Sequence, residues 1–240
     1  MVASTAEQRR TAAALVERHG RTYAEDAGIT LADKPSPLWR LLVLSLLLSA
    51  RISADIAVAA ARELSRAGYR TPRSMREATW QDRVDALGRG HYRRYDERTA
   101  SMLGEVADRV LEEYAGDLRR LHAAAREDAS AGASHPVRDG GQAGELAAAL
   151  SRRLQEFTGI GPTGASIFCR EVQGIWPDLA PYVDDRAAGG AERLGLSRAP
   201  QRLARLVDAE DLPRLVAGCV RAARDDDVVA DVRAACRQSR

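Results

Sequence analysis

The chain has 240 residues, of which 45% are hydrophobic, which is enough to bury the core of one large domain or of two small domains packed together. Its 36 basic and 34 acidic residues give a formal charge of +2, so an anionic partner must be met by a local basic patch and not by the field of the whole protein. The cysteines Cys169, Cys219 and Cys236 lack the close spacings of metal sites, which argues against a disulfide scaffold or a zinc site.

The N-terminal segment is polar, and it lacks the short apolar core and the cleavage site of a signal peptide. The most apolar run, residues 38–50, is too short to span a bilayer and contains Arg40, so it is interpreted as a buried helix. We therefore expect a cytoplasmic protein without a membrane partner.

Aromatic residues and β-branched runs are few, and apolar residues recur at spacings of three and four in most segments. This pattern predicts a nearly all-α chain. Residues that favour helix N-termini support several boundaries, among them Ser53, Thr79 and Asp211. The expected helices cover residues 6–27, 37–49, 54–67, 74–78, 80–88, 96–114, 118–126, 145–157, 163–172, 185–194, 201–207, 211–224 and 228–238.

Residues 126–145 consist largely of glycine, serine, alanine and charged residues without a helical period. Such a stretch predicts a surface loop, flexible over residues 127–145, that separates two helical blocks. The sequence shows no internal repeat and no heptad run long enough for a coiled coil.

The helical pattern breaks at FTGIGPTGASIF, residues 157–168. Gly159 and Gly161 allow a tight turn, and Pro162 suits the first turn of a new helix because the N–H that it lacks has no acceptor there. The sequence thus predicts two helices joined by a hairpin. Free amides at the start of the second helix form an anion site, and such a hairpin grips a nucleic-acid backbone without reading its bases. A plain tight turn between packed helices is the alternative.

A connection rich in glycine and proline, GIWPDLAPYVDDRA, follows over residues 174–187 and leads into another helix. It places Asp184 at or near the N-terminus of that helix, where the helix dipole keeps a carboxylate ionised. A simple N-cap is the alternative role. Asp185 competes with Asp184, because helix direction would aim only one of the two side chains into a cleft. Glu156 and Glu171 flank the hairpin, and exposed salt-bridging is the role expected for both.

The hairpin followed by an aspartate resembles the helix-hairpin-helix DNA glycosylase superfamily, and most closely its endonuclease III-like branch, over roughly residues 35–196. The resemblance implies an all-α, two-lobed glycosylase fold with a helix-hairpin-helix motif and a cleft between the lobes. One domain would comprise residues 35–184, and the second would combine residues 1–34 with residues 185–240.

The resemblance also assigns site residues. LLVLSLLLSARISAD looks like the first core helix of the family and the turn after it, which would place Arg51 in the DNA stack. The loop that carries HYRRY looks like the wedge between a pair of helices, so His91 and Tyr92 would contact the lesion. The hairpin contacts with DNA would come from Gly159, Ile160, Gly161, Thr163 and Gly164.

The function implied by the resemblance is that of a monofunctional DNA glycosylase in base excision repair. The protein would act as a nucleoid-associated monomer on double-stranded DNA that contains a damaged or mismatched base. Asp184, matched to the catalytic aspartate of the family, would stabilise the oxocarbenium-like sugar and orient or deprotonate the attacking water. The alternative is a non-catalytic DNA-binding protein that keeps the hairpin to grip the backbone. A third possibility is a hairpin that only packs helices in a protein that binds a small molecule or another protein.

Two departures from the endonuclease III pattern limit this chemistry. The family lysine that forms a Schiff base is Thr163 here, and Lys34 is the only lysine in the chain, so no AP-lyase activity is expected. The iron–sulfur cluster of that branch needs four grouped cysteines, whereas only Cys219 and Cys236 follow Asp184, so no cofactor and no metal are expected. Members of the superfamily handle oxidised, alkylated and mismatched bases on one scaffold, so the sequence does not identify the substrate base.

Overall fold

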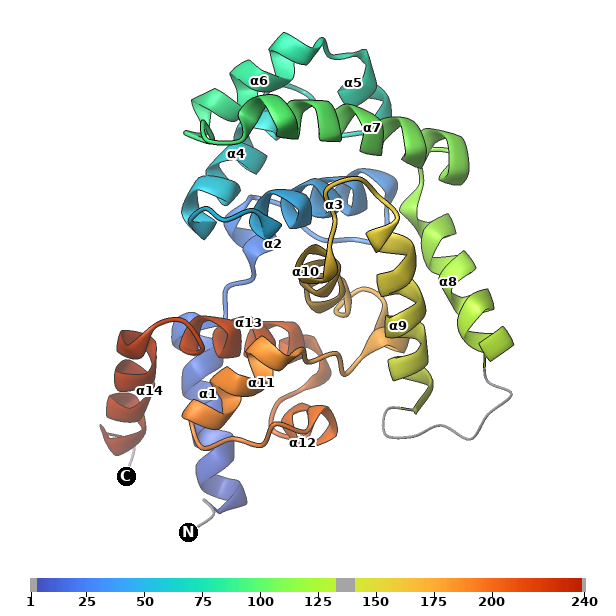
Figure 1. Cartoon of the computed structure of the whole chain (residues 1–240). Helices are drawn as coiled ribbons and strands as arrows, with labels where there is room; N and C mark the ends of the chain where they lie inside the picture. The colour runs from blue at the N-terminus through green and yellow to red at the C-terminus, as the bar shows by residue number, and fades with distance from the viewer. Residues whose placement is uncertain (1–3, 133–140, 239–240) are drawn as a thin grey trace.

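The computed structural model describes residues 4–132 and 141–238. Across these residues every regular element is a helix, as the apolar spacing predicts (Figure 1). The elements in chain order are α1 (Thr5–His19), α2 (Tyr23–Asp26), α3 (Pro35–Ser49), α4 (Ala54–Arg66), α5 (Pro72–Glu77), α6 (Trp80–Arg89), α7 (Asp96–Tyr114), α8 (Leu118–Gly132), α9 (Gly141–Gln155), α10 (Pro162–Val172), the 3-10 helix η1 (Pro177–Leu179), α11 (Asp185–Arg193), α12 (Pro200–Ala204), the 3-10 helix η2 (Ala209–Asp211), α13 (Leu212–Ala222) and α14 (Asp226–Gln238).

Most helix boundaries lie within a few residues of the predicted ones, and α7 matches its predicted range of 96–114. The single helix predicted over residues 6–27 is wrong, because the chain forms α1 and α2 there. Gly20 ends α1 and lies so close to the Val16 carbonyl that a Cβ atom would be 2.3 Å from its oxygen. Thr22 then begins α2 with a reciprocal capping box.

The loop predicted over residues 127–145 is wrong at both of its ends, because α8 continues to Gly132 and α9 begins at Gly141. Its middle part, residues 133–140, lies outside the described residues. Arg153 of α9 donates to both carboxylate oxygens of Asp128 on α8, at 2.6 and 2.9 Å. Contacts between α8 and α9 thus stabilise helical structure in residues whose own composition favours a loop.

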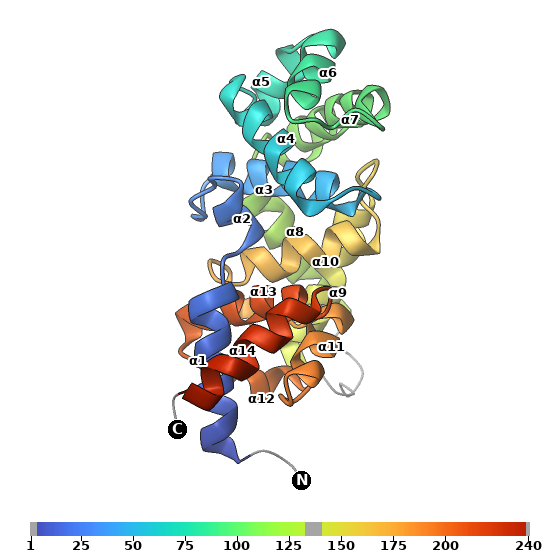
Figure 2. The same ribbon diagram turned by 90° about the vertical axis from the view of Figure 1, so that its left-hand side faces the viewer.

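Among the described residues, buried apolar side chains form two clusters, and the helices that carry the two clusters lie one above the other in Figure 1. The larger cluster contains residues of α2 to α10, and the smaller one joins α1 to α11–α14 (Figure 2). Ala24, Ala27 and Ile29 are buried in the larger cluster, so the assignment of all of residues 1–34 to the second domain is wrong beyond α1. The chain crosses from one core to the other between α1 and α2, and again after η1.

The apolar helix α3 is central to the larger core. Residues 41–47 are all buried, including Ser45, whose hydroxyl donates to the Leu41 carbonyl at 2.9 Å. α4 and α10 both pack against α3. This packing brings the turn after α3 close to the start of α10, although the two segments are distant in the sequence.

In the described part of the chain, no helix is long and apolar enough to cross a membrane, and no group of three or more His, Cys, Asp and Glu side chains is arranged to hold a metal ion. Cys169 and Cys219 are free and buried, and burial raises the pKa of each thiol to about 12. Both thiols therefore stay protonated at neutral pH.

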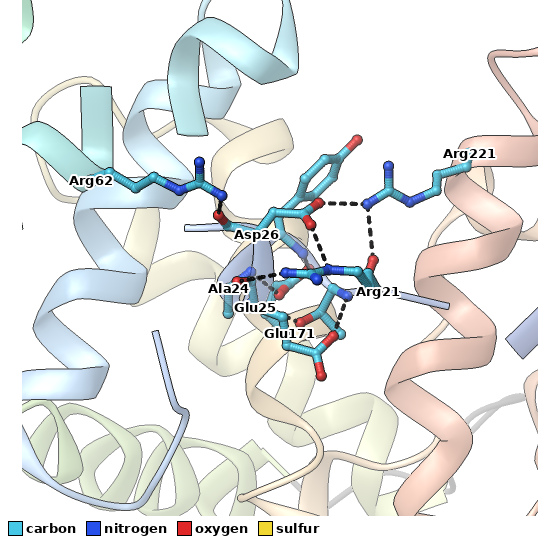
Figure 3. Close-up of polar contacts among 9 residues, drawn as sticks. Arg21, Ala24, Glu25, Asp26, Arg62, Glu171 and Arg221 are labelled. Carbon is cyan, nitrogen blue, oxygen red and sulfur yellow. Dashed lines mark hydrogen bonds and ion pairs between the residues drawn. The ribbon is translucent and has the colours of Figure 1, made fainter. Parts of the chain in front are cut away.

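α2 is a polar junction between the two cores (Figure 3). Glu171 of α10 accepts the amide N–H groups of Tyr23 and Ala24 at 3.2 and 2.9 Å. From the smaller core, Arg221 of α13 donates to the Asp26 carboxylate at 2.7 Å. The exposed salt bridge expected of Glu171 is wrong, because this side chain is buried, and burial raises its pKa against the opposing effect of the two amides. α2 is thus fixed from both sides.

Candidate nucleic-acid interface

α9 and α10 are joined by a tight turn over residues 156–161. Gly159 has a φ of 84°, in the left-handed region that favours glycine, and Pro162 is the first residue of α10. Ile160 is 4% exposed and belongs to the larger core. A DNA contact from Ile160 is therefore limited to its backbone, and its side chain anchors the turn instead.

The start of α10 carries backbone amides without a partner inside the helix. The first helical hydrogen bond runs from the Ala165 amide to the Gly161 carbonyl at 3.0 Å, so the amides of Thr163 and Gly164 precede the repeating pattern. Thr163 is exposed and Gly164 is buried. A Cβ atom added to Gly161 would have no heavy atom within 4 Å, so the space beside these amides is open.

Glycine lets the hairpin turn approach α3 and α7 closely. A Cβ atom on Gly159 would lie 2.6 Å from Sδ of Met102 on α7. The Ser49 hydroxyl, at the end of α3, lies 3.5 Å from the Gly159 carbonyl oxygen. A Cβ atom on Gly164 would be 3.4 Å from the Ser45 carbonyl oxygen. The turn is therefore held against two helices that come from the first half of the chain.

A cavity of about 250 Å³, the hairpin cavity, lies where this turn meets the end of α3 and the α6–α7 loop. Leu46, Tyr92 and Thr99 are buried lining residues, whereas Arg51 and Arg98 are exposed. The lining residues are Leu46, Ser49, Ala50, Arg51, Tyr92, Tyr95, Arg98, Thr99, Met102 and Gly159.

The residues predicted to contact a lesion have different environments. Arg51 lines the hairpin cavity, and His91 is exposed in the adjoining loop with a φ of 62°, which is uncommon for a residue with a Cβ atom. Tyr92 is only 2% exposed, with its hydroxyl 3.4 Å from that of Thr99. Tyr92 therefore presents little surface for the lesion contact predicted for it, although it lines the hairpin cavity. Tyr95, which lines the same cavity, is half-buried.

Arginines make this region locally basic. Arg51, Arg93 and Arg98 are exposed, and within residues 4–132 and 141–238 their side chains make no ion pair or hydrogen bond. The Arg94 guanidinium lies over the ring of Tyr95, 5.3 Å from its centroid. Guanidinium groups without acidic partners provide the local basic patch that the nearly neutral net charge requires for an anionic partner.

Asp184 is the N-cap of α11, which is the alternative role that the sequence suggested for it. Its Oδ1 accepts the Ala187 amide at 3.0 Å, and its Oδ2 is paired with the guanidinium of Arg170. The side chains of Asp184 and Arg170 are 16% and 6% exposed, so little of the pair contacts solvent. Asp185 is exposed at the first position of α11. Of the two aspartates, only Asp184 is therefore directed toward α10.

Arg170 belongs to a polar stripe on α10 that sequence reasoning missed. Ser166 bonds the hydroxyl of Tyr182 at 3.2 Å. Gln173 accepts the Tyr182 amide at 2.9 Å and donates to the Tyr182 carbonyl at 3.1 Å. Positions 166, 170 and 173 thus hold the connection that ends at Asp184. The spacing of four and three residues between these polar positions, in an otherwise apolar helix, could have predicted the stripe, because residues so spaced share one helix face.

Lys34 is far from the hairpin. It is the N-cap of α3, and the hairpin contacts the opposite end of this helix at Ser49. The 15 residues of α3 extend about 22 Å at the helical rise per residue. The Lys34 backbone is therefore at the far end of α3 from the hairpin turn.

Glu156, before the hairpin turn, is exposed and pairs with Arg109 at 2.8 Å, which confirms the salt-bridging role expected for it.

Comparisons of the chain with models of protein families, with curated proteins and with solved structures found no match. The likeness to helix-hairpin-helix glycosylases therefore rests on the hairpin and aspartate motifs of the chain itself.

Proposed function

We propose that this protein is a helix-hairpin-helix DNA glycosylase that binds duplex DNA and hydrolyses the N-glycosidic bond of a damaged or mismatched base. One observation carries the proposal: the hairpin turn, the turn after α3 and the α6–α7 loop meet at the hairpin cavity. These segments supply backbone amides, the free guanidinium of Arg51 and an exposed loop that ends near Arg98. All three are suited to a nucleic-acid backbone.

The DNA backbone would be held at the start of α10. The amides of Thr163 and Gly164 offer donors, and the open space beside Gly161 lets a phosphate oxygen approach them. In Figure 2 the hairpin turn and the turn after α3 lie at the same edge of the molecule. Arg51 lines the hairpin cavity together with Gly159, so it would add a cation beside the hairpin turn. Such contacts neutralise phosphates without reading the bases, so binding would be independent of sequence.

Excision would take place at the boundary between the two cores, in the cleft of a two-lobed fold. The Asp184–Arg170 pair spans this boundary, because α11 contributes to the smaller core and α10 to the larger one. Flipping a nucleotide into the cleft costs a few kcal/mol, and least for a damaged or mismatched base. Catalysis needs a carboxylate oxygen of Asp184 within hydrogen-bond reach of the sugar or of the attacking water. Oδ2 would therefore exchange Arg170 for the substrate.

A non-catalytic DNA-binding protein is the second candidate, and the Asp184–Arg170 pair is the observation that favours it. A carboxylate that caps its own helix and neutralises a buried guanidinium already has a complete structural role. In this case the hairpin would grip the backbone, and the carboxylate would only join the two cores.

Binding is tested by fluorescence anisotropy with a labelled duplex at several salt concentrations. Affinity should fall steeply with salt, because phosphate contacts release counterions. The double substitution Arg51→Ala and Arg98→Ala should weaken binding and flatten the salt dependence, whereas Arg73→Ala, which removes an exposed arginine on α5, should change neither. Failure of every duplex to bind at low salt would refute both candidates.

Catalysis is tested with duplexes that carry alkylated, oxidised, deaminated or mismatched bases, followed by hot alkali to cleave at abasic sites. The glycosylase proposal expects cleavage of at least one substrate by the wild type and none by Asp184→Asn. Duplex binding without any Asp184-dependent abasic site would leave the second candidate. The wild type should not be trapped on abasic DNA by borohydride, because Thr163 replaces the amine. Efficient trapping contradicts that part of the proposal.

A further inference from the structure

The hairpin cavity has a size and a lining that backbone binding at α10 does not use. At about 250 Å³ it lies just below the range of about 300 to 1,000 Å³ that is usual for drug-sized ligands, so it suits a single ring system. Buried Leu46 and half-buried Tyr95 and Met102 give it apolar surface, while two arginines lie at its exposed side. Apolar walls with a few converging polar groups are typical of a small-ligand site.

We infer that the hairpin cavity receives one unpaired nucleobase whose edge carries hydrogen-bond acceptors, with guanine as the best fit. This inference deepens the proposed function and rests on its DNA-binding part. The site is separate from the proposed excision site, because none of the residues that hold Asp184 lines this cavity.

The walls of the cavity suit the flat face of a base. Tyr95 lines the cavity and is half-buried, and aromatic rings bind unpaired bases by stacking. Met102 adds a polarizable thioether, which packs favourably against aromatic rings. A base that leaves the duplex stack would therefore recover apolar contact in this cavity.

The polar groups select the edge of the base. Arg51 and Arg98 donate hydrogen bonds and accept none, and neither side chain has a partner within the described residues. The paired acceptors O6 and N7 of guanine match the fork of a guanidinium, whereas adenine presents a donor beside its N7 acceptor. Two guanidinium groups at one cavity therefore favour guanine over adenine.

Two residues with left-handed backbones fix the shape of the cavity. His91, with a φ of 62°, directly precedes the buried Tyr92, and Gly159, with a φ of 84°, presses the hairpin turn against Met102. A residue such as His91 keeps this conformation only where its surroundings impose it, and such residues cluster at ligand sites. The cavity is thus built into the folded chain before any base enters it.

The test compares three labelled duplexes of one sequence, which are fully paired, carry a single bulged guanine or carry a single bulged adenine. Anisotropy should show about tenfold tighter binding of the bulged guanine than of the other two duplexes. The double substitution Arg51→Lys and Arg98→Lys keeps both charges but removes the guanidinium forks. It should abolish the guanine preference, which is measured in each variant as the ratio of its affinities for the bulged-guanine duplex and for the fully paired duplex. Arg73→Lys serves as the control and should not alter this ratio.

Equal affinities for the three duplexes, or a guanine preference that survives the double substitution, would overturn the inference while leaving the proposed backbone binding intact. Failure of the wild type to bind the fully paired duplex would instead refute the proposed function. Competition separates a base from a phosphate as the occupant. Guanosine, which has no phosphate, should remove the preference for the bulged guanine, and inorganic phosphate should not. The reverse result would assign the cavity to the backbone and overturn the inference.

Discussion

Gly159 and Gly161 stand two residues apart in the hairpin turn, but substitution by alanine should affect different properties of the protein. Alanine at position 159 must adopt a φ of 84°, which costs roughly 1–2 kcal/mol for a residue with a Cβ atom. Its Cβ atom would also lie 2.6 Å from Sδ of Met102, and moving that flexible side chain adds about 1 kcal/mol. We therefore expect Gly159→Ala to lower the free energy of unfolding by about 2–3 kcal/mol.

Gly161→Ala is the matched substitution. Gly161 has a φ of −96° and a ψ of −171°, which alanine adopts freely, and no heavy atom lies within 4 Å of the added Cβ. Gly161 is also the N-cap of α10, where alanine is less favourable than glycine, so the free energy of unfolding should fall by no more than about 1 kcal/mol. The methyl group would occupy the space through which a phosphate reaches the amides of α10, so the affinity for duplex DNA should fall several-fold.

Urea unfolding followed by far-UV circular dichroism measures the first property, and anisotropy with a labelled duplex measures the second. Adding Met102→Ala to Gly159→Ala should recover the part of the loss that comes from the contact with sulfur, which a double-mutant cycle isolates. Destabilisation by Gly161→Ala equal to that of Gly159→Ala would refute the structural reasoning. Unchanged duplex affinity in Gly161→Ala would refute the placement of a phosphate at the start of α10.

Two further predictions concern the smaller core and do not depend on the proposed function. A Cβ atom on Gly190 of α11 would lie 1.8 Å from the backbone oxygen of Cys219, so Gly190→Ala should destabilise the protein by about 3 kcal/mol in urea unfolding. Gly189→Ala, in open space on the same helix, should stabilise it by roughly 0.5–1 kcal/mol, and a similar loss in both variants would contradict the packing of α11 on α13. Hydrogen bonds from Arg18 hold the pKa of Asp231 at about 2, below that of an unfolded aspartate. Because the folded state favours the ionised form, this contribution is complete above about pH 4 and is lost as the pH falls toward 2. Denaturation curves across this range should show a smaller pH dependence in Asp231→Asn, and identical dependence in the two proteins would rule out the contact between α1 and α14 as its source.

The helical content and most of the helix boundaries follow from local features of the sequence. The apolar spacing of α7 and the N-cap residues Ser53 and Thr79 act within one or two turns of helix, so they can be read without a partner segment. The glycines and the proline of the hairpin are equally local, because each fixes the backbone at its own position. Where packing overrides these local features, the elements predicted from the sequence are wrong. The helix expected over residues 6–27 breaks at Gly20, and the loop expected from residue 127 continues as α8.

The polar contacts depend on tertiary structure, because their partners are distant in the sequence or separated by an irregular connection. Glu171 is an ordinary charged residue by sequence, yet it is buried and caps α2, whose amides lie about 150 residues away in the chain. Arg170 could be recognised as part of a polar stripe, but only the path of the chain through Tyr182 directs it to Asp184. Burial decides such pairs, because a charge that is removed from water must find a partner.

The sequence by itself determined that the chain is helical, that the helical pattern breaks at Gly159 and Gly161, and that an aspartate follows at a helix start. These properties depend on residue type and on spacing along a single helix. Only the tertiary structure decided which residues gather around the hairpin, why Tyr92 is buried, and that the Asp184 carboxylate is shared with Arg170. Those outcomes depend on how α3, α7, α10 and α11 pack, because long-range packing sets both exposure and the distance between charges.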